Sequence, residues 1–194
     1  MCIRDRSLIM AKKVIIVTGP IGSGKSTAIS YISKKGFKTL DLDKISNDII
    51  NSKESLKFLE EKFPGVIKNK LLDKESLANI VFSDNEKLQI LEEYLHPKIL
   101  IQFQEQASEI EGTLFVEVSA PKNIYKDFDC LVVIAPESSR IERLLDRGMQ
   151  LNDIKNRIST QRSEEWWSSL GQVITNNSID SLEQEIDNYI NEKI

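Results

Sequence analysis

A glycine-rich stretch near the amino end limits the possible fold more than any other feature of this chain. Residues Gly19 to Ser26 read GPIGSGKS, which matches the pattern Gly-x-x-x-x-Gly-Lys-Ser/Thr of a phosphate-binding loop. The loop follows the β-branched run VIIV and precedes STAISYISKKG, which has the spacing of a helix that ends near Gly36. A strand, this loop and a helix in that order predict a doubly wound α/β fold with a parallel sheet.

The residue types in the loop explain how it would bind phosphate. Glycines let the backbone curl so that successive N–H groups point inward, and the start of the following helix adds partial positive charge. Lys25 is expected to reach the β- and γ-phosphates of ATP, and Ser26 is expected to place its hydroxyl on Mg²⁺. The remaining expected contacts to ATP come from Gly22, Ser23, Gly24 and Thr27. A turn that only joins strand to helix explains the glycines but not Lys25.

The rest of the chain continues the alternation of strands and helices around one long interruption. FKTLDLD reads as a second strand, and charged amphipathic segments from about residue 45 to 110 indicate a helical insertion. Further strands are expected at TLFVEV, CLVVIA and QVIT, and further helices at SSRIERLLDRG, LNDIKNRISTQRSEEWWSS and from Ser181 onward. The pattern predicts a five-stranded parallel sheet in a single domain that spans residues 10–194.

Charge and composition exclude several classes of function. Lys and Arg number 26 against 30 Asp and Glu, and the resulting net charge of −4 offers no basic field for nucleic acid or an anionic membrane. No apolar run approaches the ~20 residues that span a bilayer, and the amino end lacks a secretory signal, so we expect a cytoplasmic protein. Cys2 and Cys130 are too few for a disulfide framework, and we expect Cys130 to be a buried small residue. We expect a monomer.

The first nine residues differ in character from the rest. MCIRDR can be back-translated into a sequence that resembles a transposon-end adapter, and the stretch 1–9 shows no pattern of secondary structure. We interpret residues 1–9 as a non-native or disordered extension and Met10 as the native start.

Acidic residues follow two of the expected strands, on the edge of the sheet where ligands of such folds bind. Asp41 and Asp43 end the second strand, and two residues apart on a strand they would point the same way. Such a carboxylate can accept the proton of a hydroxyl that attacks the γ-phosphate, although either residue could instead cap the next helix. Glu117, at the end of TLFVE, is a candidate to contact Mg²⁺ through water.

Six motifs, in this order and spacing, are similar to those of the dephospho-CoA kinase family: GPIGSGKST, DLDKISNDI, LHPKI, RIERLLDRG, NRISTQ and VITNN. The resemblance runs from about Lys12 to the carboxyl end. It implies a nucleoside-monophosphate-kinase-like fold with a helical acceptor-binding insertion at about 45–110 and a helical lid at about 140–168. It also implies ATP-dependent phosphorylation of the ribose 3′-hydroxyl of dephospho-CoA, the last step of coenzyme A synthesis.

The resemblance assigns roles to individual residues. Asp43 matches the second aspartate of the family's Asp-x-Asp, which makes it the expected base. Arg143 and Arg147 match lid arginines, and their i, i+4 spacing would let one helical face close over the phosphates, whereas the alternative is a pair of solvated surface residues. The remaining matches are Arg157 and Gln161 ahead of the Trp pair, and Asn176 and Asn177 near the adenine.

Three other side chains have open alternatives. His96, the only histidine, is expected to stabilise a helix start or to shape the acceptor pocket, and a single histidine does not predict zinc. Trp166 and Trp167 are expected to pack in the interior, with contact to adenine or pantetheine as the alternative.

One segment departs from the family pattern. Ser119, Ala120 and Pro121 stand where family members usually have apolar residues, and the loop is about two residues short. This change in the segment Ser119–Asn123 motivates two alternatives: another small-molecule phosphate-loop kinase acting on a nucleotide or sugar, or a nucleotide-binding module that has lost catalysis. Retention of Asp43 and both lid arginines argues against the second alternative, because ATP binding alone does not require an acceptor-side carboxylate.

Overall fold

A computed structural model describes residues 13–121 and 128–194 of the chain. The interpretation of residues 1–9 as an extension, and of Met10 as the native start, therefore concerns residues outside the described part. The chain divides into two compact units. Leu42–Gln106 form the first, here the helical unit, and the chain up to Asp41 together with Ala107–Ile194 forms the second, here the sheet unit.

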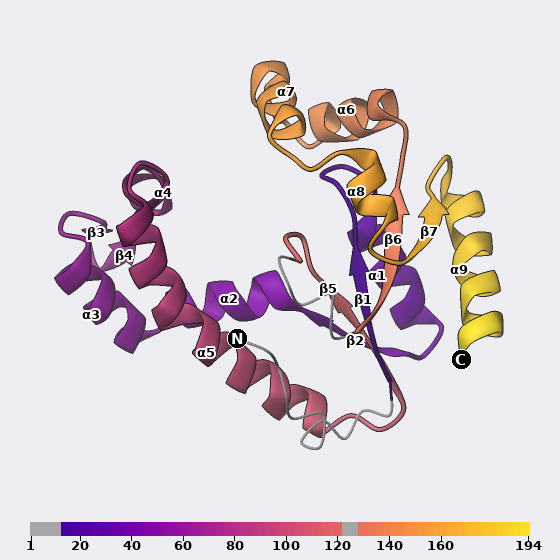
Figure 1. The fold of residues 1–194 in the computed structure, drawn as a ribbon, viewed down its shortest axis with the longest axis horizontal. Coiled ribbons are helices and arrows are strands. Elements are labelled where there is room, and N and C mark those ends of the chain that lie inside the picture. Colours follow the sequence, from indigo (N-terminus) through magenta and orange to yellow (C-terminus); the bar gives the residue numbers. More distant parts are fainter. Residues whose placement is uncertain (1–12, 122–127) are drawn as a thin grey trace. The chain divides into compact units, whose positions relative to one another are not determined.

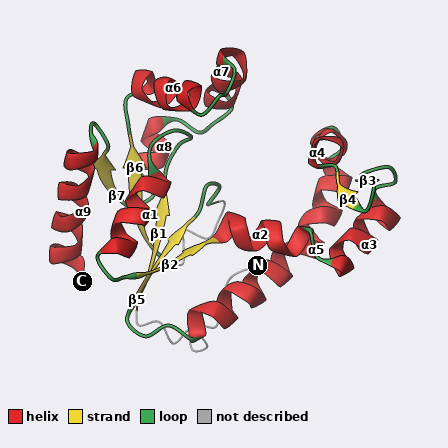
Figure 2. Ribbon diagram, turned by 180° about the vertical axis from the view of Figure 1, so that it is seen from behind, coloured by secondary structure: helices red, strands yellow, loops and turns green. Residues whose placement is uncertain are grey.

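The sheet unit is built on five parallel strands, as the sequence predicts. The strands are β1 (Lys13–Thr18), β2 (Lys38–Asp41), β5 (Thr113–Glu117), β6 (Asp129–Ile134) and β7 (Gln172–Thr175). Their order across the sheet is β2-β5-β1-β6-β7, with every neighbouring pair parallel (Figure 2). The central strands are buried on both faces, which explains why VIIV and LVVI are continuous apolar runs rather than alternating ones.

Two helices cover one face of this sheet and form its main core. Ile15 and Val17 of β1 pack against α1 (Lys25–Lys34) and α9 (Ile179–Lys193) in a cluster whose members are at most 3% exposed. Full burial of each such side chain contributes about 1.5–3 kcal/mol, so this cluster is the main source of stability for the elements that carry the glycine loop. Cys130, 3% exposed, is the buried small residue that the sequence predicts.

Three helices follow β6 in the chain, and the first two lie beyond its carboxyl end in Figure 1. They are α6 (Glu137–Asp146), α7 (Leu151–Ser159) and α8 (Glu164–Ser168). The prediction of one continuous helix through LNDIKNRISTQRSEEWWSS is wrong, because the chain leaves the helix after Ser159. Ser163 then starts a new helix by accepting a hydrogen bond from the Trp166 amide, a side-chain cap that competes with helix continuation.

The helical unit contains α2 (Leu42–Ile50), α3 (Lys53–Lys62), α4 (Lys74–Phe82) and most of α5 (Asn85–Ser108). Sequence analysis missed a small antiparallel hairpin between α3 and α4, formed by β3 (Ile67–Lys68) and β4 (Leu71–Leu72). Asn69 and Lys70 form its turn with positive φ angles of 51° and 64°. Each hairpin strand has only two residues, too few for the alternation that reveals a strand in a sequence.

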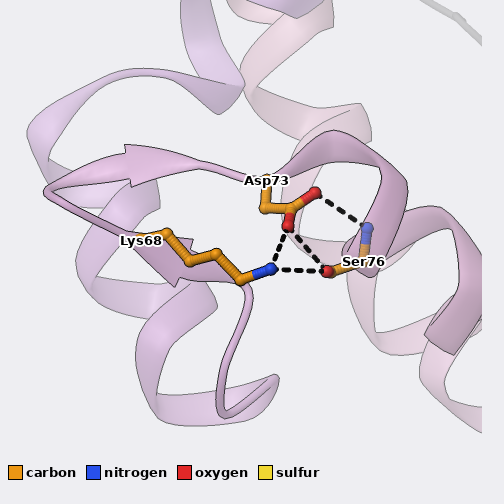
Figure 3. Close-up of polar contacts among 3 residues, drawn as sticks. All are labelled: Lys68, Asp73 and Ser76. Carbon is orange, nitrogen blue, oxygen red and sulfur yellow. Dashed lines mark hydrogen bonds and ion pairs between the residues drawn. The ribbon is translucent and has the colours of Figure 1, made fainter.

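Asp73 joins this hairpin to the start of α4 (Figure 3). Its carboxylate accepts hydrogen bonds from the Ser76 amide at 3.1 Å, from the Ser76 hydroxyl at 2.8 Å and from the Lys68 ammonium. The Lys68 ammonium, followed by the two Ser76 donors, lowers the pKa of Asp73 well below its usual range. The cap thus satisfies an amide that the first turn of a helix leaves without a partner.

Two expectations from the sequence place residues in the wrong element. Asp43 does not end the second strand: β2 stops at Asp41, and Asp43 lies in the first turn of α2, where a carboxylate interacts favourably with the helix dipole. His96 does not stand at a helix start, since it is exposed in the interior of α5, directly before Pro97. None of the helices described in residues 13–121 and 128–194 combines the length and apolarity that crossing a bilayer requires.

Candidate active site

The glycine loop joins β1 to α1 in a conformation that needs its glycines. Gly24 is the N-cap residue of α1 and has a φ of 105°, in the left-handed region that L side chains rarely adopt. A Cβ added there would lie 2.0 Å from the Asn176 side-chain nitrogen, and one added at Gly19 would lie 2.0 Å from the Val133 carbonyl oxygen. The loop is therefore closely packed against segments more than a hundred residues away in the sequence.

Lys25 starts α1 and turns back over the loop. Its ammonium donates to the carbonyl oxygens of Gly19 at 3.0 Å and Pro20 at 3.2 Å. These two hydrogen bonds hold the ammonium at the loop, and the residue as a whole is half-buried. This is the position from which a lysine can contact phosphate oxygens bound by the loop.

A hydroxyl and a carboxylate meet beside the loop. Ser26 Oγ donates to Glu117 Oε1 at 2.8 Å, and Glu117 is 8% exposed at the carboxyl end of β5. Thr18 fixes the neighbouring strand end by donating to the Val118 carbonyl oxygen at 2.7 Å. Asp41, on the adjacent strand β2, pairs in register with Glu117. A second carboxylate therefore stands next to Glu117 across the sheet.

This pair of oxygen ligands fits the coordination that Mg²⁺ prefers. Magnesium is commonly bound by one or two protein oxygens, with water and substrate phosphates filling its other positions. No cluster of three or more His, Cys, Asp or Glu side chains stands in the described residues as an all-protein metal site. A magnesium site formed by Ser26, Glu117 and the phosphates of a bound nucleotide would not require such a cluster.

Arg143 donates hydrogen bonds to the backbone of the loop. Its Nη1 donates to the carbonyl oxygens of Gly22 and Ser23, both at 3.3 Å, and its Nη2 donates to Asn176 O at 3.1 Å and Oδ1 at 3.2 Å. Asn176, 4% exposed, donates in turn to the Ser23 carbonyl oxygen at 2.8 Å. Ser23 is fully buried, and its hydroxyl has no hydrogen-bond partner among the described residues, so its expected contact to phosphate stays a prediction.

Three other residues expected at the nucleotide site are more exposed. Arg147 is the C-cap residue of α6, one place beyond the last helical residue, and is exposed. Arg157 and Asn177 are exposed as well. The two arginines of the i, i+4 pair therefore differ. Arg143 is hydrogen-bonded to the loop, whereas Arg147 is exposed at the end of α6.

Sequence analysis missed Arg140, which also contacts the loop. Arg140 Nε donates to the Ile21 carbonyl oxygen at 2.8 Å, and its Nη2 donates to Gln161 Oε1 at 3.2 Å. Burial lowers the pKa of Arg140 from its ordinary value, while the carboxylates of Glu137 and Glu164 oppose that shift. The available signal was its position three residues before Arg143 on the same helix, which places both on one face.

Three of the residues expected on the acceptor side are exposed. Asp43 is exposed in the helical unit, and Ser119 and Ala120 are exposed at the end of the strand that carries Glu117. The rest of the segment expected to contact the acceptor, from residue 122 to 127, lies outside the described residues.

The tryptophan pair divides between interior and surface. Trp167 is 4% exposed, as expected for a packing residue, and its ring meets that of Trp166 edge to face at 5.0 Å. The Arg162 guanidinium lies 5.7 Å from the centre of the half-buried Trp166 ring.

A family model described as dephospho-CoA kinase matches residues 13–183. A dephospho-CoA kinase of Corynebacterium glutamicum is 32% identical over 189 residues, which cover 91% of this chain and 97% of that protein. A dephospho-CoA kinase of Deinococcus radiodurans is 32% identical over 181 residues, covering 88% of this chain and 87% of that protein.

Two solved structures are similar to this chain in both sequence and fold. The crystal structure of TT1252 from Thermus thermophilus matches with a TM-score of 0.86 and 30% identity, covering 95% of this chain and 99% of that one. A dephospho-CoA kinase from Campylobacter jejuni matches with a TM-score of 0.59 and 30% identity, covering 93% of this chain and 96% of that one.

Proposed function

This chain belongs to the dephospho-CoA kinase family, and from that premise we propose that it phosphorylates the ribose 3′-hydroxyl of dephospho-CoA with ATP and Mg²⁺. The observation that carries the proposal is the 2.8 Å contact between Ser26 and Glu117, next to a lysine held over the glycine loop. An ammonium and a hydroxyl at the start of a helix, beside a carboxylate at a strand end, are groups that can bind a magnesium nucleotide.

The loop would bind the triphosphate through its backbone amides and the first turn of α1. Lys25 would exchange its bonds to the Gly19 and Pro20 carbonyl oxygens for bonds to the β- and γ-phosphates. When bound, Mg²⁺ supplies positive charge that offsets the charge developing on the phosphates during transfer. Ser26 and Glu117 would hold it, the serine directly and the glutamate directly or through water.

The acceptor would be oriented by Asp43. Its carboxylate would accept the proton of the ribose 3′-hydroxyl as that oxygen attacks the γ-phosphorus and the bond to the β–γ bridging oxygen breaks, releasing ADP. The exposure of Asp43 supports this role, because a carboxylate that must accept a substrate proton needs access to the substrate.

The two lid arginines would act differently. Arg143 has two nitrogens bonded to carbonyl oxygens of the loop and of Asn176, so it would hold the shape of the nucleotide site. Arg147, exposed beside the end of α6, would reach the phosphates and offset the charge of the transition state. Asn177 would contact the adenine, next to the buried Asn176. We expect the protein to act as a monomer in the cytoplasm.

An acceptor panel tests this function. The protein and MgATP are incubated separately with dephospho-CoA, AMP, CMP and gluconate, and ADP release is measured with each. We expect rapid ADP release with dephospho-CoA only, and a product phosphorylated at the ribose 3′-position by phosphorus NMR. ADP release with a nucleotide or gluconate instead would identify another small-molecule kinase. ATP binding without release of ADP in any mixture would identify a nucleotide-binding module.

A further inference from the structure

Two residues of the α6–α8 region hold the backbone of Ile21 in the glycine loop. The Ile21 amide donates to Gln161 Oε1 at 3.0 Å, and the Ile21 carbonyl oxygen accepts from Arg140 Nε at 2.8 Å. Arg140 and Gln161 are also bonded to each other at 3.2 Å. Both polar groups of the Ile21 backbone are therefore fixed by one connected set of hydrogen bonds.

Fixing Ile21 also fixes the peptide groups on either side of it. A trans peptide is planar, and its C=O and N–H point in opposite directions. Because the Ile21 carbonyl oxygen points to Arg140, the Gly22 amide in the same peptide points away from Arg140. Because Gln161 holds the Ile21 amide, the Pro20 carbonyl oxygen points away from Gln161, and it accepts from Lys25 Nζ and the Ser23 amide.

The packing agrees with these hydrogen bonds. Gly22 has a φ of 76°, and a Cβ added there would lie 2.9 Å from the Arg140 carbonyl oxygen and 3.1 Å from the Arg140 Cβ. The backbone of the loop thus lies directly against α6 at Arg140. Arg140 is half-buried at this contact, so it is not a solvated surface residue.

We propose that Arg140 is a positioning residue for ATP binding, which acts through Ile21 and Gln161 to hold the loop in the conformation that binds phosphate. The inference rests on the proposed nucleotide function, because the direction of the Gly22 amide matters only if a phosphate binds there. A loop that already has its bound conformation loses less conformational freedom on binding, so its ligand binds more tightly. Arg140 need not contact the nucleotide.

The first test measures the affinity for a magnesium complex of a non-hydrolysable ATP analogue by calorimetry, without any acceptor. Arg140→Met keeps an unbranched apolar chain out to the position of Nε but removes every donor, and we expect the dissociation constant to rise about tenfold. Arg140→Lys keeps one cationic donor group and should give a smaller rise. Lys155→Met, the same loss of charge at an exposed site on α7, is the matched control and should leave the affinity unchanged.

A second variant separates positioning from a loss of folding. Gln161→Met removes the acceptor shared by Ile21 and Arg140, and the double variant should weaken binding no more than the stronger single variant, because both act through one hydrogen-bonded set. With dephospho-CoA as acceptor, the KM for ATP should rise while the KM for dephospho-CoA stays within about twofold, a split that general destabilisation would not give.

Unchanged affinity in folded Arg140→Met and Gln161→Met proteins would overturn the inference, as would fully additive losses in the double variant. These outcomes are distinct from failure of the proposed function, which would appear in the unaltered protein as an absence of analogue binding or of transfer to dephospho-CoA.

Discussion

The glycine loop and the segment that carries Asp43 both follow strands of the same sheet, but the chain holds them differently. The loop carbonyl oxygens of Ile21, Gly22 and Ser23 accept hydrogen bonds from side chains more than a hundred residues away. Asp43, in contrast, is an exposed residue in the first turn of α2. We therefore expect substitutions around the loop to alter stability and ATP affinity, and substitution of Asp43 to alter turnover alone.

The largest expected effect is the loss of turnover on substitution of Asp43. Asp43→Asn should lower kcat by about 10²-fold or more, the usual contribution of a positioned base, while the affinity for ATP and the unfolding midpoint stay nearly unchanged. Steady-state kinetics and calorimetry measure both quantities. Asp48→Asn, exposed on the same helix, is the control and should retain full turnover. An unchanged kcat in Asp43→Asn would remove this residue from the mechanism.

A glycine pair tests how tightly the loop is packed. Gly24→Ala should lower the free energy of unfolding by about 2–3 kcal/mol and weaken ATP binding, because the new Cβ adds a clash with Asn176 to the strain of a positive φ. Gly36→Ala has a similar φ of 94° but open space around its Cβ, so it should cost only the strain of about 1–2 kcal/mol and leave ATP binding unchanged. Urea denaturation and calorimetry compare the two. Equal losses in both variants would show that the contact with Asn176 carries no energy.

The asparagine pair separates structural from ligand contacts. Asn176→Ala removes the bond to Ser23 and leaves Arg143 with fewer acceptors, so we expect a loss of about 1–3 kcal/mol in stability and weaker ATP binding. Asn177→Ala, at an exposed site, should leave stability within about 0.5 kcal/mol and affect only nucleotide affinity. Thermal unfolding with and without MgATP distinguishes the two variants. A larger loss of stability in Asn177→Ala would reverse the assignment.

The smallest effect concerns pH and the helical unit. The native pKa of Asp73 is held low by Lys68 and Ser76, so its contribution to stability is present above its unfolded pKa of about 4 and is lost as pH falls below that value. Unfolding by urea between pH 6 and 3 should show a steeper loss for the unaltered protein than for Asp73→Asn. Glu60→Gln, exposed on α3, is the control and should behave like the unaltered protein. Parallel curves for all three proteins would contradict this role of the cap.

Local patterns in the sequence predict the parts of the site that depend on neighbouring residues. The glycine loop, the strand before it and the helix after it follow from residues 13–36 alone, and the five parallel strands follow from apolar runs. The start of α2 was misplaced because Leu42 and Asp43 suit a strand end and a helix start equally well. A two-residue strand in the hairpin left no periodic signal.

The contacts around the loop could not be predicted because they join residues distant in the sequence. Nothing local indicates that Arg140 and Gln161 would hold Ile21, or that Asn176, rather than Asn177, would be buried against Ser23. The family resemblance identifies Gln161 and both asparagines as candidates and puts the asparagines near the adenine, but it gives none of them a contact within the protein. Arg140 could have been found only by noticing that it shares a helical face with Arg143.

The most direct test of the account is a crystal structure with dephospho-CoA and a non-hydrolysable ATP analogue bound together with Mg²⁺. The account predicts that the ribose 3′-oxygen lies in line with the γ-phosphate held by the glycine loop, and within about 3 Å of an Asp43 carboxylate oxygen. A complex in which another side chain occupies that position, with Asp43 remote from the 3′-oxygen, would contradict it.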